Sequence, residues 1–448
     1  MRSLLIYVFI IIANLYLAQG QDLRYLHFSD SIISQINNQH SERLNNYKLQ
    51  NGDISLYEKI YERRKENLEK AFSDSLFVYD KLIYEGIDHC LQKISTSNEA
   101  IQEENYTILV SNSPIANAYS IGGGTIILNL GILRKIRTQG ELAFIIAHEI
   151  GHDYKQDVDI SAYRNLERLD SEEFEDAIDR IDKEKYNRRA QLETFFKRLY
   201  LTEMKFSRQQ EIRADSLALK FILNANYDYR YSISTLNLLD SIDFYTFPAI
   251  DYSNTLGFED YPFKEKWIID KSDLFSMAAE SPDEDTKALK SHPDVEERIA
   301  RLKLITEVKA DTTTEFFNPR KLPALKSGVD LDLAFIDSWE AQNNYGRALF
   351  FSLKQLEAQA DNKQLLRRIS KLFDKIYEAQ NSHELSRYVE SPGPYQEATY
   401  KEFITFLSRI RLSELEMLIY HFHLKNSGLL GQDEDFLDTL NKYKLKIR

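Results

Sequence analysis

Two histidines four residues apart flank a glutamate in the run His148-Glu149-Ile150-Gly151-His152. In a helix, residues four apart lie on the same face, so both imidazoles can be presented to a single ion, with Glu149 beside them. Zinc suits such a site, because it accepts neutral imidazole and carboxylate ligands and, in catalytic sites, keeps one position for water. The run therefore predicts one zinc ion per chain that activates water, with Glu149 as the proton acceptor.

A third protein ligand must come from elsewhere, and a carboxylate would complete the two-histidine, one-glutamate set of water-activating zinc peptidases. Glu211 and Asp215 lie four apart in a charged helical stretch. This spacing assigns Glu211 to the ion and Asp215 to a hydrogen bond with a ligating histidine, most simply His148. The alternative is an ordinary pair of solvated helix charges, which so acidic a stretch also allows.

The elements expected to position these residues are mainly helices with a few strands. Apolar residues at helical spacing, with no proline, predict helices over residues 22–97. Helical periodicity resumes at Gly140 and carries through the histidines, and 161–219 reads as long, charged helices. Strand-like runs occupy 106–110, 116–121 and 125–130. The last two runs surround the glycine triplet 122–124, which predicts a hairpin.

The C-terminal third is predicted to be a separate helical unit over residues 331–448, after a linker at 309–330 that contains Pro319 and Pro323. Residues 345–362 resemble the second helix of a tetratricopeptide repeat, and another helix is expected at 365–377. Stacked arrays need several repeats and only about one is visible, so an unrelated helical bundle is an equal alternative. His421 and His423 have no ligand spacing tied to a carboxylate and are expected at the surface.

Length and composition limit the function classes. At 448 residues the chain should form two or three folding units. Its 57 Lys and Arg against 70 Asp and Glu, and the lack of a long basic stretch, argue against a nucleic-acid partner. Cys90 is the only cysteine, so an intramolecular disulfide is impossible.

The first twenty residues have the pattern of a secretory signal peptide. Arg2 precedes an apolar run over 4–17, and small residues at 18–20 offer a cleavage site before Gln21. An uncleaved membrane anchor is the alternative, but the run is short and contains Asn14. No later apolar run is long enough to cross a bilayer. The mature protein is thus expected to be exported to the periplasm or the outside medium, without a transmembrane segment.

Four motifs, in this order along the chain, resemble peptidase family M48, which includes the CAAX prenyl protease type, the HtpX type and a soluble periplasmic type with helical repeats. They span roughly residues 105–305. The motifs are Asn117-Ala118-Tyr119 with Gly123-Gly124 before a strand, Glu141-Leu142-Ala143 leading into the histidine run, Glu211 through Asp215, and His292-Pro293 with Glu297-Arg298.

The resemblance implies an α+β, mainly helical, gluzincin-type peptidase domain over 98–308, with a small β-hairpin or sheet at the cleft. A helical region, 21–97, precedes it. The resemblance also implies that His148, His152 and Glu211 bind zinc. Glu149 is then the general base and Asp215 the outer partner of a ligating histidine.

The same resemblance implies that the strand with Asn117, Ala118 and Tyr119 forms an edge of the cleft. An extended peptide would add to it through main-chain hydrogen bonds, and Asn117 would reach the substrate backbone. His292 would cap the metal at rest or stabilise the developing oxyanion. The alternative is that His292 simply precedes a helix entry, with Pro293 in the first turn.

The expected function is an exported zinc endopeptidase that hydrolyses unfolded or misfolded envelope proteins. One alternative is an envelope assembly or chaperone-like factor that binds a protein partner through its C-terminal helices and has a rarely active zinc site. Another is a membrane-tethered peptidase that retains its first helix. Zinc content and casein cleavage, compared with a Glu149→Gln variant, separate the first two hypotheses.

Overall fold

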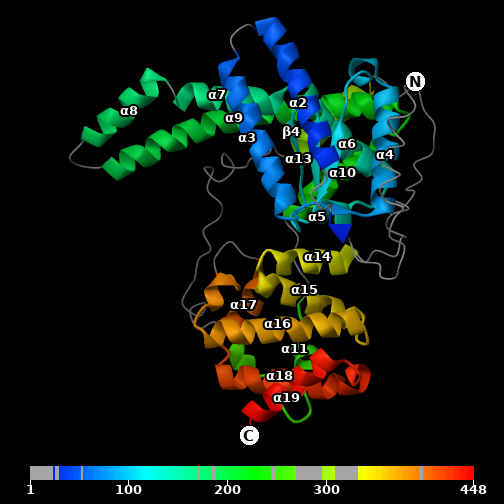
Figure 1. Ribbon diagram of the computed structural model, residues 1–448, viewed down its shortest axis with the longest axis vertical. Coiled ribbons are helices and arrows are strands. Elements are labelled where there is room, and N and C mark those ends of the chain that lie inside the picture. The colour runs from blue at the N-terminus through cyan, green and yellow to red at the C-terminus, as the bar shows by residue number, and fades with distance from the viewer. Residues whose placement is uncertain are drawn as a thin grey trace.

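The computed structural model describes residues 24–25, 30–51, 54–169, 171–183, 188–243, 249–268, 295–307, 331–392 and 397–447. Within them the fold is mainly helical, as predicted, with one small three-stranded sheet and a separate pair of two-residue strands. Figure 1 shows the sheet and the helices α2 to α10 and α13 above a stack formed by α14 to α19. The predicted signal peptide at 1–20, the linker at 309–330 and His292 lie outside the described residues.

The sheet has three strands in the order β3-β5-β4. Strand β5 (Thr125–Asn129) pairs in parallel with β3 (Thr107–Ser111) and antiparallel with β4 (Ala118–Gly122). All three glycines at 122–124 have positive φ, between 65° and 81°, a region that favours glycine. The predicted hairpin is confirmed, and β4 forms one edge of the sheet.

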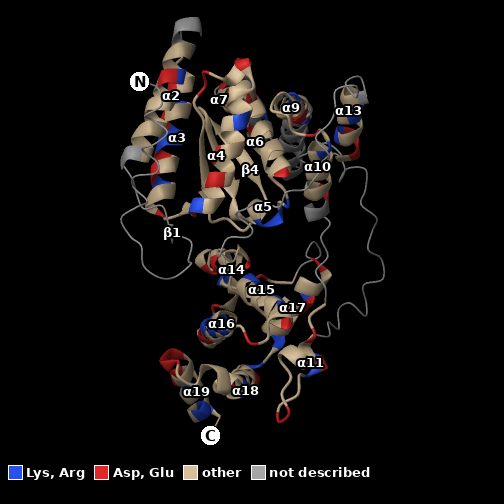
Figure 2. Cartoon of the chain, turned by 90° about the vertical axis from the view of Figure 1, so that its right-hand side faces the viewer, with Lys and Arg blue, Asp and Glu red and all other residues tan. Residues whose placement is uncertain are grey.

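Helices cover both faces of this sheet. Neighbouring residues of a strand point to opposite faces, so each strand contributes to two cores. One core joins the sheet to α4 and α6, and the other joins it to α2 and α3. Figure 2 shows α2 and α3 on one side of the sheet and α6, α9 and α10 on the other. The strand residues of the first core are Ile108, Val110, Ile126 and Leu128, and those of the second are Leu109 and Ile127.

The helices in this part lie within the stretches predicted to be helical and also at 130–135 and 230–243, where no helix was predicted from the sequence. They are α2 Asp30–Asn51, α3 Ser55–Ser73, α4 Lys81–Thr96, α5 Leu130–Lys135, α6 Gln139–Tyr154, α7 Asp157–Leu169, α8 Glu172–Lys183, α9 Arg188–Asn224, α10 Arg230–Asp243 and α13 Val295–Glu307. A two-residue strand pair, β1 (Arg24–Tyr25) with β2 (Val78–Tyr79), joins the start of the described chain to the segment before α4. None of the described helices is long and apolar enough to cross a membrane.

The C-terminal helices have a core of their own. They are α14 Leu331–Ala341, α15 Tyr345–Ala358, α16 Lys363–Asn381, α17 Ala398–Arg409, α18 Leu412–Leu430 and α19 Glu434–Lys446. The segment 249–268, with α11 (Tyr252–Thr255), packs into this core through Tyr252, Leu256 and Trp267. The predicted division into 98–308 and 331–448 therefore separates this segment from the helices that it contacts.

The expectation that His423 lies at the surface is wrong. Its ring is fully buried, Nδ1 bonds the carbonyl of Ile419, and Nε2 lies 2.7 Å from Oγ of Ser370. Burial lowers the pKa of His423 to about 4, so the ring is neutral and both nitrogens have partners. It is a hydrogen-bonded core histidine.

Candidate active site

Close packing of α6 against α9 brings the predicted site residues together. Helix α6 begins with a capping box, in which Thr138 and Glu141 each accept a hydrogen bond from the other's backbone N–H. Farther along, a Cβ atom added to Gly151 would lie 3.3 Å from Cα of Ala214 on α9. Two small residues at the crossing thus allow the histidine face of α6 to meet the carboxylate face of α9.

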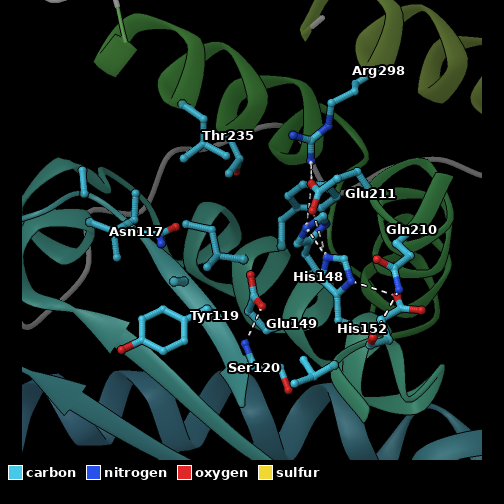
Figure 3. A pocket seen from close by; sticks show the side chains of 18 of the residues that line it. Asn117, Tyr119, Ser120, His148, Glu149, His152, Gln210, Glu211, Thr235 and Arg298 are labelled. Atoms are coloured by element: carbon cyan, nitrogen blue, oxygen red, sulfur yellow. Dashed lines mark hydrogen bonds and ion pairs between the residues drawn. The ribbon is translucent and has the colours of Figure 1, made fainter. Parts of the chain in front are cut away.

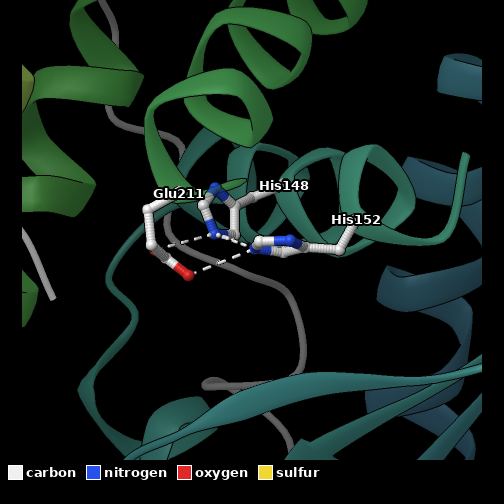
Figure 4. Close-up of side chains that lie close together, drawn as sticks. All are labelled: His148, His152 and Glu211. Atoms are coloured by element: carbon white, nitrogen blue, oxygen red, sulfur yellow. Dashed lines mark hydrogen bonds and ion pairs between the residues drawn. The ribbon is translucent and has the colours of Figure 1, made fainter. Parts of the chain in front are cut away.

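Three predicted ligands converge at this crossing, as Figure 4 shows. Nε2 of His148 lies 3.1 Å from Nε2 of His152 and 3.5 Å from Oε2 of Glu211. Nε2 of His152 lies 3.3 Å from Oε1 of Glu211. Ligands at about 2.1 Å in tetrahedral geometry are separated from one another by about 3.4 Å. The three separations thus fit the donor set of a tetrahedral zinc site.

The outer nitrogens of both histidines face carboxylates. Nδ1 of His152 lies 2.9 Å from Oδ2 of Asp157, and Nδ1 of His148 lies 3.1 Å from Oδ1 of Asp215. The His148 contact has ion-pair distance but is not aligned as a hydrogen bond. A proton on each Nδ1 leaves the Nε2 lone pairs directed at one another and at Glu211. Such an arrangement calls for a cation between them.

Arg298 on α13 completes a buried charge network behind the ligands. Its guanidinium donates to both oxygens of Asp215, at 2.6 and 2.7 Å, and lies 3.4 Å from Oε2 of Glu211. Asp215 is only 1% exposed. Burial raises the pKa of Asp215, but Arg298 and His148 outweigh it and hold the pKa below its ordinary value. Asp215 is therefore charged and fixed in place.

The surrounding carboxylates also raise the pKa values of both histidines. Burial lowers the pKa of His148, but Asp215 and Glu211 outweigh burial and raise it to about 9. Burial likewise lowers the pKa of His152, which Asp157 and Glu211 raise to about 10. The negative potential therefore favours positive charge at the imidazoles, whether protons or a metal ion.

Glu149 lies on the open side of the histidine pair, in a cavity of about 490 Å³ between α6 and β4. Its Oε2 accepts a hydrogen bond of 2.8 Å from the backbone N–H of Ser120 on the edge strand. Asn117, Ala118 and Tyr119 line the same cavity. Figure 3 shows Glu149 directed into the space between this strand and the histidines, so that the general base predicted from the sequence faces the predicted substrate strand.

Two residues of the network have roles that the sequence did not predict. Asp157 faces His152 because Gln156, with φ of 54°, turns the chain back between α6 and α7. Arg298 was noted only as part of the fourth motif, and its contact with Asp215 spans 83 positions. The separation of five residues between His152, near the end of α6, and Asp157 was a usable signal for this contact. No local pattern pairs Arg298 with Asp215.

The N-terminal helices also contact the site. Arg43 of α2 forms an ion pair with Asp153, which follows His152, and Asp153 also accepts the N–H of Gly124 at 2.8 Å. Arg64 of α3 forms a buried ion pair with Asp159 of α7. These two arginines tie α2 and α3 to the glycine turn and to both sides of the α6–α7 connection.

Comparisons with known proteins agree with this geometry. The profile of peptidase family M48 matches residues 85–306, which include the sheet, the histidines, Glu211 and Arg298. The mitochondrial metalloendopeptidase OMA1 of Arabidopsis thaliana is 28% identical over 138 residues, which cover 31% of this chain and 26% of that protein. The similarity thus spans about a quarter of the length of this relative.

Proposed function

Because this chain belongs to peptidase family M48, we propose that it is a zinc-dependent endopeptidase with His148, His152 and Glu211 as metal ligands and Glu149 as general base. The observation that carries this proposal is the donor set, in which two imidazole nitrogens and a carboxylate lie 3.1 to 3.5 Å apart. Their spacing and chemistry suit zinc. The orientation of the rings by Asp157 and Asp215 supports the same assignment.

A bound zinc ion supplies Lewis acidity, which polarises a peptide carbonyl and lowers the pKa of water to about 7. Glu149 accepts the proton of the attacking water and delivers it to the leaving amine. The carboxylate accepts the proton in the first transfer and gives up the same proton in the second, so the side chain has to stay aimed into the cleft throughout, and the Ser120 N–H helps to hold one of its oxygens there. No covalent intermediate with the protein is needed.

The edge strand is proposed to hold the substrate in extended form. The carbonyl of Asn117 accepts the N–H of Asn129 in β5, whereas the N–H of Ser120 points the other way, to Glu149. By alternation, the N–H and carbonyl of Ala118 and the carbonyl of Ser120 face the open edge, where a peptide can add as a further strand. Unfolded segments suit this mode of binding, with Asn117 and Tyr119 beside the bound chain.

The finer proposals rest on the sequence. The apolar segment at 4–17 supports export, with cleavage before Gln21, and hence misfolded envelope proteins as substrates. The helices after residue 331 are proposed to dock a protein partner. His292 is proposed to cap the metal or stabilise the oxyanion, a role that lies outside the described residues.

Glu149→Gln is the central test, because it keeps the shape of the side chain and removes the base. The variant should bind about one zinc ion per chain, as the parent does, and cleave casein roughly 100- to 10,000-fold more slowly. Glu167→Gln, an exposed position on α7, is the matched control. Equal cleavage by parent and Glu149→Gln would refute the peptidase assignment. Mass measurement of the exported protein tests whether its chain begins at Gln21.

A further inference from the structure

A second cavity, of about 1130 Å³, lies between α3, α7 and the edge strand β4. Tyr119, Ser120 and Val158 line both this cavity and the active-site cleft, so the two are continuous along the strand. Gln342, which follows α14, closes part of it from the C-terminal side. A segment bound along β4 would therefore pass from one cavity into the other.

The surface that this second cavity exposes is mostly apolar, although polar side chains and charged side chains of α3, such as Lys59 and Glu62, also line it. Leu68 and Ala71 of α3, Leu76, and Ala162 and Leu166 of α7 face it, with Ile121 from the edge strand. Two large side chains of this cavity are exposed, Leu76 by 41% and Tyr119 by 39%. Apolar side chains that remain accessible in a cavity next to an active site are typical of a ligand subsite.

Alternation along the edge strand connects this cavity to a bound peptide. Ala118 packs toward the core beneath α6, whereas Ile121 packs toward the core beneath α3. A peptide that pairs with β4 has the same two-residue period, so every second side chain points to the α3 side. The remaining side chains point into the cleft with His148 and Glu149. In Figure 3 the Tyr119 ring likewise lies away from the histidine pair.

We propose that this α3–α7 groove binds the bulky hydrophobic side chains at alternate positions of an extended substrate, and so selects segments that are normally buried in folded proteins. The inference rests on the proposed function, which places the bound peptide along β4 and past Glu149. Helix α3 lies outside residues 85–306, the part that matches the family. One wall of the groove therefore comes from the N-terminal region and the other from α7, which lies inside the matching part.

The test uses two quenched fluorescent peptides that differ only in having leucine or serine at every second position. The parent protein with zinc should cleave the leucine peptide with a kcat/KM at least about tenfold higher, because hydrophobic pockets discriminate on this scale. Leu166→Asp should bring the ratio close to one. Leu169→Asp, on the same helix but outside the groove and 53% exposed, should leave the ratio unchanged.

A second variant guards against a folding defect in the first. Ala162→Phe fills the groove without adding charge and should also lower the ratio, while cleavage of the serine peptide stays near the parental value. Binding of the same peptides to Glu149→Gln protein, measured by fluorescence anisotropy, gives a readout that does not need catalysis.

These measurements separate the two hypotheses. In one outcome the parent cleaves neither peptide, the Glu149→Gln protein binds the leucine peptide more tightly than the serine peptide, and Leu166→Asp removes that preference. This result would refute the peptidase assignment and support the groove proposal. If cleavage occurs with equal efficiency for both peptides and for Leu166→Asp, the groove proposal is overturned and the peptidase assignment stands. A concentration-dependent dimer that Leu166→Asp dissociates would identify a second copy as the occupant and also overturn the proposal.

Discussion

Replacement of Asp215 by Asn should weaken zinc binding, although Asp215 is not itself a predicted metal ligand. The carboxylate neutralises Arg298 through two hydrogen bonds of 2.6 and 2.7 Å and lies 3.1 Å from Nδ1 of His148. Asparagine keeps the shape, but it removes the charge that orients the imidazole. Loss of such an outer partner costs on the order of 10- to 100-fold in metal affinity.

The charge left on Arg298 adds to this effect. Its guanidinium already lies 3.4 Å from Oε2 of Glu211. At an effective dielectric constant of about 20, the Coulomb attraction at this distance is about 5 kcal/mol before desolvation. Without Asp215, Arg298 competes with the metal for Glu211. Both consequences lower zinc affinity, and an unpaired buried charge also destabilises the fold by about 3–5 kcal/mol.

Competition with a chromophoric chelator measures the zinc affinity, and calorimetry of the metal-free protein measures stability. Asp228→Asn is the matched control, because Asp228 pairs with Arg230 at the surface, where such pairs contribute about 0–1 kcal/mol. Asp215→Asn combined with Arg298→Met should recover stability, while zinc affinity stays at least about tenfold below that of the parent. Parental zinc affinity in Asp215→Asn would refute the assignment of Asp215 as the orienting residue.

Three further outcomes are expected. Chelation of zinc should lower the calorimetric melting temperature, because a ligand present at 100 times its dissociation constant stabilises the folded state by about 2.7 kcal/mol; an unchanged temperature would contradict a bound metal. Gly123→Ala should lower the free energy of unfolding, measured by urea denaturation, by more than about 1 kcal/mol, since the φ of Gly123 is 65° and a Cβ atom would lie 2.3 Å from Cδ2 of His40. Glu414→Gln should lower the free energy of unfolding by about 1–2 kcal/mol at pH 7, because Glu414 accepts hydrogen bonds from Lys264 and Trp267. Burial raises the pKa of Glu414, but the lysine contacts outweigh burial and lower this pKa to about 2. The difference in the free energy of unfolding between parent and variant should therefore shrink as the pH falls from about 4.5 toward 2. A difference that persists unchanged at pH 3 would contradict the ion pairing.

The parts of the site that were predictable from the sequence are those set by local geometry. A four-residue spacing places two side chains on one helix face in any fold, which is why His148 with His152, and Glu211 with Asp215, were paired correctly as neighbours. The glycine triplet likewise predicts its hairpin, because it supplies three positive φ values in succession.

Contacts between segments distant in sequence were not predictable in this way. The segment 249–268 leaves the peptidase part and packs with the C-terminal helices through an aromatic cluster that includes Tyr252 and Trp267. Its sequence has no helical or strand period that would indicate this partner. His423 was misplaced for a related reason, because the hydroxyl of Ser370 that satisfies it comes from another helix.

The N-terminal helices, for which the sequence predicted only helical structure, contact the elements that carry the site. Their apolar residues form one face of the sheet core, while Arg43 and Arg64 neutralise the buried acids Asp153 and Asp159. Loss of either arginine would leave a buried carboxylate unpaired next to the histidine helix or the wall of the groove. The same helices that complete the fold around the edge strand therefore also determine the charge balance behind the predicted metal ligands and the shape of the cavity beside them.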